Sequence, residues 1–401
     1  MLLVLTIALS ACDATKRVPK DRHLLRENLV YVNGAKTDDA KINNFVLQKP
    51  NSYILGMPIS LYIYNLGNPN AEKDFAQWID THPRWHRFLK GFLSEKQVGR
   101  LQKSFLVSGI DHQLQRIGEA PAVLDTARVH KSTKQLGAYF RSIGYFNNKV
   151  TDSIFPLPKE EKQQAKVGYY ITTGERYYLD SLKTKITSPE IDSVYQLHKS
   201  KTFLKSGAPY QLSDFSNERS RLYELFRNNG FYTFQQSSIN FQIVRDTVTA
   251  QKDTKLQVTT GDLIERDGDV ITTKKYKVHH INKIRLYTDY DSKVDKSTLD
   301  SLQYRDMLIY YKGKLRYRPR VLYHATGLRK GAVYSDVERG NTYRQFNNLR
   351  VFRYPNMEFK YAANDTLQNK LDANIYLSSM DRFSLRLTNE VKRSEIEAIG
   401  F

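Results

Sequence analysis

The sequence of 401 residues has a single cysteine, Cys12, so it cannot form an internal disulfide bond or a metal site made of several cysteines. After residue 11 it has no apolar run long enough for a transmembrane helix. Common catalytic and nucleotide-binding signatures are also missing: Gly-x-x-x-x-Gly-Lys-Ser/Thr, Gly-x-Gly-x-x-Gly, Gly-x-Ser-x-Gly and His-Glu-x-x-His do not occur. These absences favour a protein that is not an enzyme and uses no cofactor.

Histidine pairs occur at two places, but neither has the pattern of a metal site. His82 and His86 are separated by Pro83 and two further residues, and no carboxylate stands where a general base would be needed. His279 and His280 are adjacent, so on a strand their rings point to opposite faces. We therefore expect no bound metal.

Acidic residues are in the minority. There are 62 Lys and Arg residues against 42 Asp and Glu, which gives a formal net charge of +20. Such a balance favours an acidic partner, which could be nucleic acid, an anionic membrane surface or an acidic protein. The charge does not by itself choose among the three, and solubility alone would also account for it.

The N-terminus carries a short apolar run, residues 1–11, with the length of a signal-peptide core. It ends in Leu9-Ser10-Ala11-Cys12, which resembles the lipobox of bacterial lipoproteins, in which the cysteine is acylated. We therefore predict a signal peptide at 1–11, lipidation of Cys12, and a polar tether at 12–24. A lipidated chain would be anchored to a membrane and would face an extracytoplasmic space.

A helix-stop motif occurs twice in the chain, at 136–146 and at 222–232. In each copy an amphipathic helix is expected to end at a glycine, Gly144 or Gly230, because glycine adopts the left-handed conformation without a Cβ penalty. Two aromatics then lead into a strand, and we expect these pairs, 145–146 and 231–232, to seat the helix on the sheet. A third copy at 343–352 keeps the apolar rhythm but has Arg350 in place of the glycine.

Around each copy the apolar pattern predicts the order β, α, α, β, β, which is an α+β fold built of tandem modules. The first module is expected at 25–174, with an insertion at about 50–118 that is rich in glycine, proline and aromatics. The second is expected at 175–262 and the third at 263–380. Residues 381–401 begin with alternating apolar and polar side chains, which fits a strand of a transmembrane barrel and an ordinary half-exposed strand equally well.

Modules of this kind behind a lipobox resemble the POTRA modules of the BamA/TamA outer-membrane assembly family. The junction Gly174-Glu175-Arg176-Tyr177 is typical of it, and the first insertion with Ile117-Gly118-Glu119-Ala120-Pro121 resembles the TamA-like (TamL) lipoproteins. In that family a transmembrane β-barrel follows the last module, so the resemblance makes 381–401 the first strand of a barrel that is truncated here. It implies an outer-membrane protein assembly factor, anchored in the outer membrane through Cys12, with its modules in the periplasm. Its implied partners are unfolded outer-membrane proteins, a TamB-like periplasmic protein and anionic lipid.

Three-stranded modules have open sheet edges, which can accept a strand of a client protein through main-chain pairing. We expect the strands after the two Gly-aromatic motifs to be such edges; the candidate residues are Asn147, Val150, Ile154, Phe234, Ile239, Phe241 and Ile243. A basic patch for lipid or an acidic partner is expected at Lys312, Lys314, Arg316 and Arg318.

The alternative hypothesis is a basic extracytoplasmic lipoprotein scaffold that binds polyanions or nucleic acid. The net charge allows it. The secretion signal and the spread of the bases over all modules argue against nucleic acid as the ligand, and we expect none.

Overall fold

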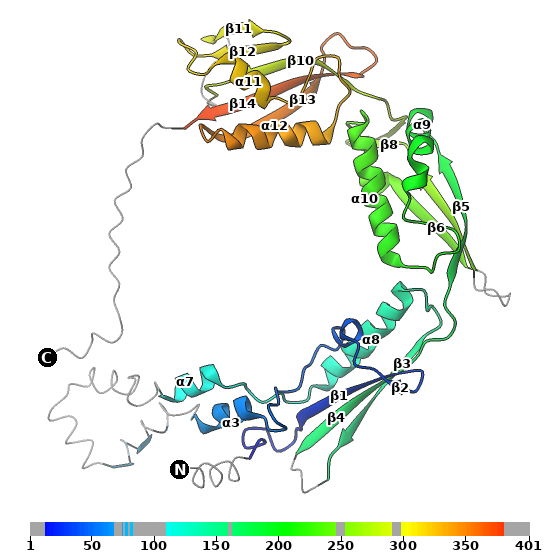
Figure 1. Ribbon diagram of the computed structural model, residues 1–401, viewed down its shortest axis with the longest axis vertical. Helices are drawn as coiled ribbons and strands as arrows, with labels where there is room; N and C mark the ends of the chain where they lie inside the picture. The colour runs from blue at the N-terminus through cyan, green and yellow to red at the C-terminus, as the bar shows by residue number, and fades with distance from the viewer. Residues whose placement is uncertain are drawn as a thin grey trace, which may run out of the picture. The chain divides into compact units, whose positions relative to one another are not determined.

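The structure of the protein is a computed structural model that describes residues 13–67, 74, 77–78, 81–82, 110–158, 163–245, 253–290 and 298–380 (Figure 1). The predicted signal peptide, Cys12 and the strand predicted at 381–401 lie outside the described residues. Among the residues that are described, no helix has both the length and the apolar character to cross a membrane. The chain divides into two compact units: one contains the residues up to Tyr178 with Pro209–Leu212, and the other contains most of the chain from Leu179 onward.

The described chain has a mixed α+β fold, and the predicted tandem βααββ architecture is confirmed. We name the repeats module 1 (from β1 to β4), module 2 (from β5 to β7) and module 3 (from β10 to β14). In each module the last strand lies between the first strand and the strand after the second helix. The repeats therefore share one strand order as well as one sequence of elements.

Module 1 is built from a mixed sheet and one long helix. Its described elements are β1 (Leu24–Val32), β2 (Ala35–Lys36), α2 (Ala40–Asn43), α3 (Ile59–Leu66), α7 (Ile110–Ile117), α8 (Thr126–Ser142), β3 (Lys149–Pro156) and β4 (Gln164–Thr172). The sheet order is β2-β1-β4-β3, with β1 parallel to β4 and β3 antiparallel to it.

Helix α8 begins where the sequence supplies a cap. The Asp125 side chain accepts hydrogen bonds from the backbone N–H groups of Ala127 and Arg128, which have no partner within the helix. Leu136 and Phe140 then lie on the buried face of α8, against a core that includes Val167 of β4. The apolar spacing of the sequence therefore predicts the buried face of this helix correctly.

The described ends of the predicted insertion in module 1 lie close together. The side chain of Asn51 donates to the carbonyl of Ala120 at 2.7 Å and accepts from the N–H of Ala122 at 2.8 Å. Next to them, a Cβ atom on Gly118 would lie 2.4 Å from the backbone nitrogen of Tyr64, so α3 and the end of α7 approach as closely as backbone allows. These contacts tie the two ends of the insertion to module 1.

Module 2 repeats the same plan. Its elements are β5 (Tyr178–Ile186), α9 (Pro189–His198), the 3₁₀ turn η3 (Lys199–Lys201), α10 (Leu212–Asn228), the 3₁₀ turn η4 (Gln236–Ser238), β6 (Ile239–Arg245) and β7 (Asp253–Thr260). The sheet order is β5-β7-β6. A separate hairpin of β8 (Leu263–Asp267) and β9 (Val270–Lys274) follows, in a stretch where the sequence predicts only a polar loop.

Module 3 has the largest sheet of the described chain. Its elements are β10 (His280–Tyr287), β11 (Asp300–Tyr304), β12 (Met307–Tyr311), α11 (Pro319–Ala325), α12 (Asp336–Asn348), β13 (Phe352–Tyr361) and β14 (Lys370–Ser379). The order is β11-β12-β10-β14-β13. The sequence pattern does not predict the hairpin β11–β12, which pairs with the edge of β10 through β12.

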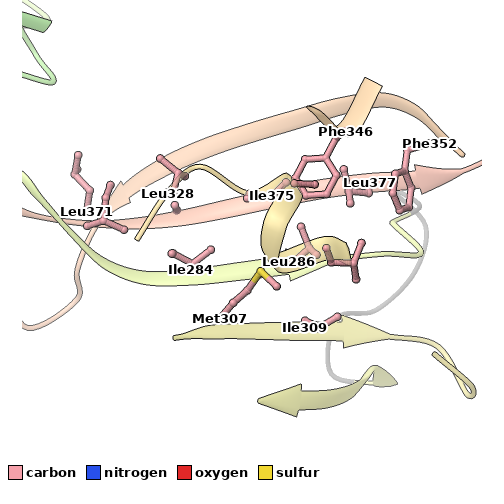
Figure 2. Close-up of a cluster of buried hydrophobic side chains, with 14 of the residues drawn as sticks. Ile284, Leu286, Met307, Ile309, Leu328, Phe346, Phe352, Leu371, Ile375 and Leu377 are labelled. Atoms are coloured by element: carbon pink, nitrogen blue, oxygen red, sulfur yellow. The ribbon is translucent and has the colours of Figure 1, made fainter. Parts of the chain in front are cut away.

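The core of module 3 lies between its sheet and its helices. Figure 2 shows Ile284, Leu286 and Ile375 on neighbouring strands, with Phe346 of α12 packed over them. Each of these side chains is at most 2% exposed. Burying such side chains is the main force that holds the helices on the sheet.

One backbone hydrogen bond is repeated at the start of every module. In each case the N–H of the first strand donates to the carbonyl of an alanine in the segment before the second helix. The pairs are Leu25 to Ala122 (2.8 Å), Leu179 to Ala208 (2.9 Å) and Ile281 to Ala332 (2.9 Å). The repeats therefore agree at the level of single hydrogen bonds.

The three copies of the helix-stop motif also agree in backbone conformation. Gly144 and Gly230 both have φ +97°, and Arg350 has φ +53°. The third helix thus ends with a left-handed residue, as the first two do, although the residue is an exposed arginine. A non-glycine residue in this conformation costs about 1 kcal/mol.

Replacing Arg350 with glycine should therefore stabilise module 3. We expect Arg350→Gly to raise the free energy of unfolding by about 0.5–1 kcal/mol, because glycine adopts the left-handed conformation without strain. Arg344→Gly, in the middle of α12, is the matched control and should lower stability by about 1 kcal/mol. Urea denaturation measures both, and a loss of stability in Arg350→Gly would contradict the assignment.

Candidate functional site

The outer strand of module 1 is β3, which in the described residues pairs with β4. The predicted edge residues Val150 and Ile154 lie on β3 opposite Ile171 and Val167, and their side chains pack on the core of module 1. Asn147 is exposed and precedes the strand. β3 therefore exposes its backbone edge and not these two apolar side chains, because Val150 and Ile154 pack on the core of module 1.

The outer strand of module 2 after its second helix is β6. Ile239, Phe241 and Ile243 lie on β6 and pair with β7. Phe234, which we expected on the same strand, lies outside it: it precedes η4, is 3% exposed, and its ring lies 4.9 Å from that of Tyr276. The chain turns Phe234 into the core before the strand begins, so this residue is removed from the candidate edge.

Module 3 has an outer strand that we did not propose, β13. Its pairing with β14 shifts register between Arg353 and Asn356, where Tyr354 has φ +41° and Pro355 supplies no N–H group. Bulges and prolines protect an edge from strand addition. β3 also has a proline, Pro156, but at its last residue, and β6 has none, whereas Pro355 lies inside β13. The position of the proline in the sequence is therefore the signal that distinguishes β13 from the other two edges.

The glycine at the end of the second helix also makes the joint to the next module. The Gly144 carbonyl accepts a hydrogen bond from the N–H of Tyr177 at 3.0 Å, and the Gly230 carbonyl accepts one from the N–H of His279 at 2.8 Å. Tyr177 and His279 each directly precede the first strand of the following module. The same bond therefore holds both connectors.

The connectors pass so close that a side chain would be crowded at Gly144 and would clash at Gly230. A Cβ atom on Gly144 would lie 3.1 Å from the carbonyl oxygen of Tyr210 and 3.2 Å from that of Tyr177. On Gly230 it would lie 2.5 Å from Cγ1 of Val278, inside contact distance. Glycine is therefore required twice, once for its backbone conformation and once for space.

The two aromatics after each glycine have different roles, whereas we expected both to seat the helix. Phe231 is fully buried in module 2, with its ring 6.1 Å from that of Phe226. Tyr232, the second aromatic, instead contacts the next module: its ring lies 6.0 Å from His279 and 4.9 Å from Tyr334. The second aromatic is a joint residue.

The first copy of the motif repeats this arrangement. The ring of Phe146 lies 5.1 Å from that of Tyr177 and 4.8 Å from that of Tyr210, in edge-to-face geometry. Such aromatic pairs contribute beyond the area they bury. Adjacent aromatics point in different directions, so spacing alone could not assign one to the core and one to the joint.

An ion pair is added at the joint of modules 2 and 3. Arg227 of α10 donates from Nε to Oδ2 of Asp336 at 2.7 Å and from Nη2 to Oδ1 at 2.8 Å, and Nη2 also donates to the Tyr334 hydroxyl at 2.8 Å. The side chains of Arg227 and Asp336 are 11% and 28% exposed. At the matching positions of the first joint the sequence has Arg141 and Leu212, so this carboxylate is particular to the second joint.

Burial and pairing act against each other in this ion pair. Burial opposes the charge of Arg227, but its hydrogen bond to Asp336 outweighs burial and raises the pKa of the guanidinium. Burial also opposes the charge of Asp336, while Arg227 and the Tyr334 hydroxyl outweigh it and lower the pKa of the carboxyl. Burial, followed by Asp336, raises the pKa of Tyr334. The pair is therefore ionised across the neutral pH range.

The connector between modules 2 and 3 has further partners. The N–H of Tyr276 donates to Oγ of Ser188 at 3.1 Å, and the N–H of Val278 donates to Oε2 of Glu190 at 2.8 Å. His279 is 3% exposed, and its Nδ1 donates to the Gly230 carbonyl at 3.1 Å. Burial lowers the pKa of His279, so the ring is neutral at pH 7.

A cavity of about 640 Å³ lies beside this joint. Its lining mixes both signs of charge with apolar side chains and comes from α10, the following turn, β8, α12 and β13: Arg227, Tyr232, Thr233, Gln235, Leu263, Glu265, Arg339, Asn356, Met357, Glu358 and Phe359. This set contains no serine, cysteine or histidine that could act as a nucleophile with a base beside it.

The four residues of the predicted basic patch are all exposed. Lys312, Lys314, Arg316 and Arg318 alternate with residues of which Leu315 and Tyr317 pack on the core of module 3. Leu315 and Tyr317 therefore fix the segment on the core of module 3, and its basic side chains face solvent. Within the described ranges, no group of three or more His, Cys, Asp or Glu residues could hold a metal ion.

A scan against protein-family models gives no match, and a search of curated proteins gives none. Among solved structures, the chain is similar to POTRA3-5 of BamA from Haemophilus influenzae, at 10% identity over 90% of this chain and 100% of that one, with a TM-score of 0.33. It is similar to POTRA1-3 of the periplasmic domain of Omp85 from Anabaena, at 9% identity over 91% and 98%, with a TM-score of 0.23. These similarities do not assign the chain to a family.

Replacing Gly230 should weaken the joint of modules 2 and 3. We expect Gly230→Ala to cost about 2–4 kcal/mol of stability, because the left-handed strain is joined by a clash with Val278. Gly331, which has φ +83° and no atom within 4 Å of an added Cβ, is the matched control, and Gly331→Ala should cost only about 1 kcal/mol. Equal losses in urea denaturation would show that the close approach is unimportant.

Removing Arg227 should leave a buried carboxylate without its partner. We expect Arg227→Met to lower the free energy of unfolding by about 2–3 kcal/mol, below the usual range for a fully buried pair because Asp336 is partly exposed. Adding Asp336→Leu should restore part of the loss, since no charge then remains uncompensated. Arg128→Met is the control: Arg128 pairs with Asp125 but its side chain is 63% exposed, so a change below about 0.5 kcal/mol is expected.

Proposed function

We propose that the chain is the module region of an outer-membrane protein assembly factor, a non-catalytic scaffold of the TamA-like lipoprotein kind. The observation that carries the proposal is the repeated module: strand order, entry hydrogen bond and glycine joint recur along one chain. The lipobox at Cys12 and the Gly-Glu-Arg-Tyr junction at 174–177 support an extracytoplasmic POTRA array. Its extent is the predicted one, with modules at 25–174, 175–262 and 263–380 in the periplasm.

Client proteins would bind by adding a strand to an open sheet edge. β3 and β6 are outer strands without the internal proline and the bulge of β13, so their backbone groups can continue the ladder with an incoming strand. Main-chain pairing depends little on sequence, which suits a factor that receives many precursors of outer-membrane proteins. The helices on the other side of each sheet keep these edges in place.

A TamB-like periplasmic protein is the proposed second partner, and the basic segment 312–318 provides charge for an acidic or anionic surface. The 381–401 stretch is proposed to enter the membrane as the first strand of a barrel. Cys12 would place a lipid anchor at the other end of the modules.

Site-directed crosslinking tests the proposed edges. A photo-crosslinking amino acid at Thr151 of β3 or at Gln242 of β6, both exposed, should give adducts with unfolded outer-membrane precursors in cells. The same group at Gln345, exposed on α12, is the control and should give few. Equal yields at the three positions, or none at the two edges, would refute client binding by strand addition.

A polyanion-binding scaffold is the second candidate, because the chain has a net charge of +20. It predicts retention of the purified chain on DNA or heparin, with a steep loss of binding as salt is raised. Retention of that kind, together with no crosslinks from β3 and β6, would reverse the order of the two candidates.

A further inference from the structure

The end of module 3 at which β14 finishes gathers several exposed side chains. Phe352, the first residue of β13, pairs with Ser379, the last residue of β14, and both are joined to Tyr317. The Tyr317 hydroxyl lies 2.9 Å from Oγ of Ser379, and its ring lies 4.6 Å from that of Phe352. We call this the exit end, because the chain continues from here into residues 381–401; Figure 2 shows Phe352 and Leu377 at this end of the sheet.

The basic segment 312–318 is fixed at the exit end. Tyr317 is one of its anchors, and Lys312 is the other: its N–H lies 3.5 Å from Oδ2 of Asp289, whose Oδ1 is 3.1 Å from Oγ of Ser379. The segment that carries the exposed side chains of Lys312, Lys314, Arg316 and Arg318 therefore lies beside the place where β14 ends.

Arg350 adds a fifth charge to the exit end. It stands two residues before Phe352, in the left-handed conformation that modules 1 and 2 reserve for glycine. At Gly144 and Gly230 the following connector crowds any added side chain, whereas Arg350 is exposed and its side chain has space. Arg350 thus has a backbone conformation that is unfavourable for arginine, at a helix end where its side chain reaches solvent beside β14.

Apolar side chains are exposed among these bases. Tyr354 is 88% exposed, Met380 47% and Val351 38%. Val351 and Met380 are held together by a hydrogen bond of 2.9 Å from the N–H of Met380 to the Val351 carbonyl. Tyr354 follows Val351 closely in sequence and lies at the bulge of β13. An exposed tyrosine and apolar side chains at the same end of a module as several bases are the composition of a membrane-interface contact.

We propose that the exit end of module 3 binds an anionic phospholipid surface. The bases Lys312, Lys314, Arg316, Arg318 and Arg350 contact lipid phosphates, while Tyr354, Val351 and Met380 enter the headgroup layer. This inference rests on the proposed function, since a chain that enters a membrane after residue 380 brings this end to the bilayer surface. An acidic protein would match the bases but would have no need of a nearly fully exposed tyrosine.

Vesicle co-sedimentation tests the proposal on the full chain carrying Cys12→Ala, so that no lipid is attached. The probes are vesicles of phosphatidylcholine alone and of phosphatidylcholine with phosphatidylglycerol. We expect binding to the anionic vesicles only. Reversing Lys312, Lys314, Arg316 and Arg318 to glutamate should weaken it at least about tenfold, because each base near an anionic bilayer contributes several-fold.

Two matched controls separate a local surface from total charge. Reversal of the exposed lysines Lys183, Lys185, Lys199 and Lys201 of module 2 changes net charge equally and should leave most binding intact. Tyr354→Ala should weaken binding several-fold, whereas Tyr343→Ala, at an exposed tyrosine of α12, should not.

Three outcomes would overturn the proposal: equal loss in both quadruple variants, unchanged binding in the 312–318 variant, or equal effects of Tyr354→Ala and Tyr343→Ala. The second is also what an acidic protein as the true partner of this segment would give. The assay contains no client protein, so its failure leaves client crosslinking at β3 and β6 untouched. Conversely, loss of those crosslinks with intact vesicle binding would refute strand addition and not the lipid surface.

Discussion

The close approach of each connector to the glycine that ends the preceding long helix is the constraint on which the joints depend. Gly144 and Gly230 stop a helix, accept a hydrogen bond from the next connector, and leave it room to pass. A larger residue would disturb all three roles at once, because the same few atoms perform them. The stop of one module and the start of the next are therefore a single structural element.

The two joints differ in the side-chain contacts that surround this shared element. The aromatic contacts of Phe146 and Tyr232 are common to both, whereas the ion pair of Arg227 with Asp336 belongs to the joint of modules 2 and 3. A bidentate arginine–carboxylate pair with little exposure restricts orientation more than a ring contact does. Modules 2 and 3 are accordingly held by directional bonds in addition to packing.

The proposed functional surfaces lie where the modules do not need their residues for folding. Among the described residues the backbone edges of β3 and β6 remain open, because each is the outer strand of a small sheet that does not close on itself. The exit end of module 3 carries Arg350 where no connector among the described residues requires a glycine. In each repeat, different residues therefore stabilise the fold and form the proposed surfaces.

The sequence by itself determined the module plan, since helices and strands follow the apolar period, Asp125 and Ser335 cap their helices, and glycine marks the helix ends. It also determined which bases of 312–318 are exposed, because they alternate with the buried side of the segment.

The sequence could not separate Phe146 and Tyr232 from the core aromatics, or exclude Phe234 from an edge strand, because neighbouring aromatics differ in direction and not in composition. The sequence pattern also did not predict the β8–β9 and β11–β12 hairpins, because each of their strands has only 5 residues, too few for a clear alternation. Only the tertiary structure paired Arg227 with Asp336 and brought 312–318 to the end of β14, because those contacts join residues far apart in the chain, and no local pattern carries such distances.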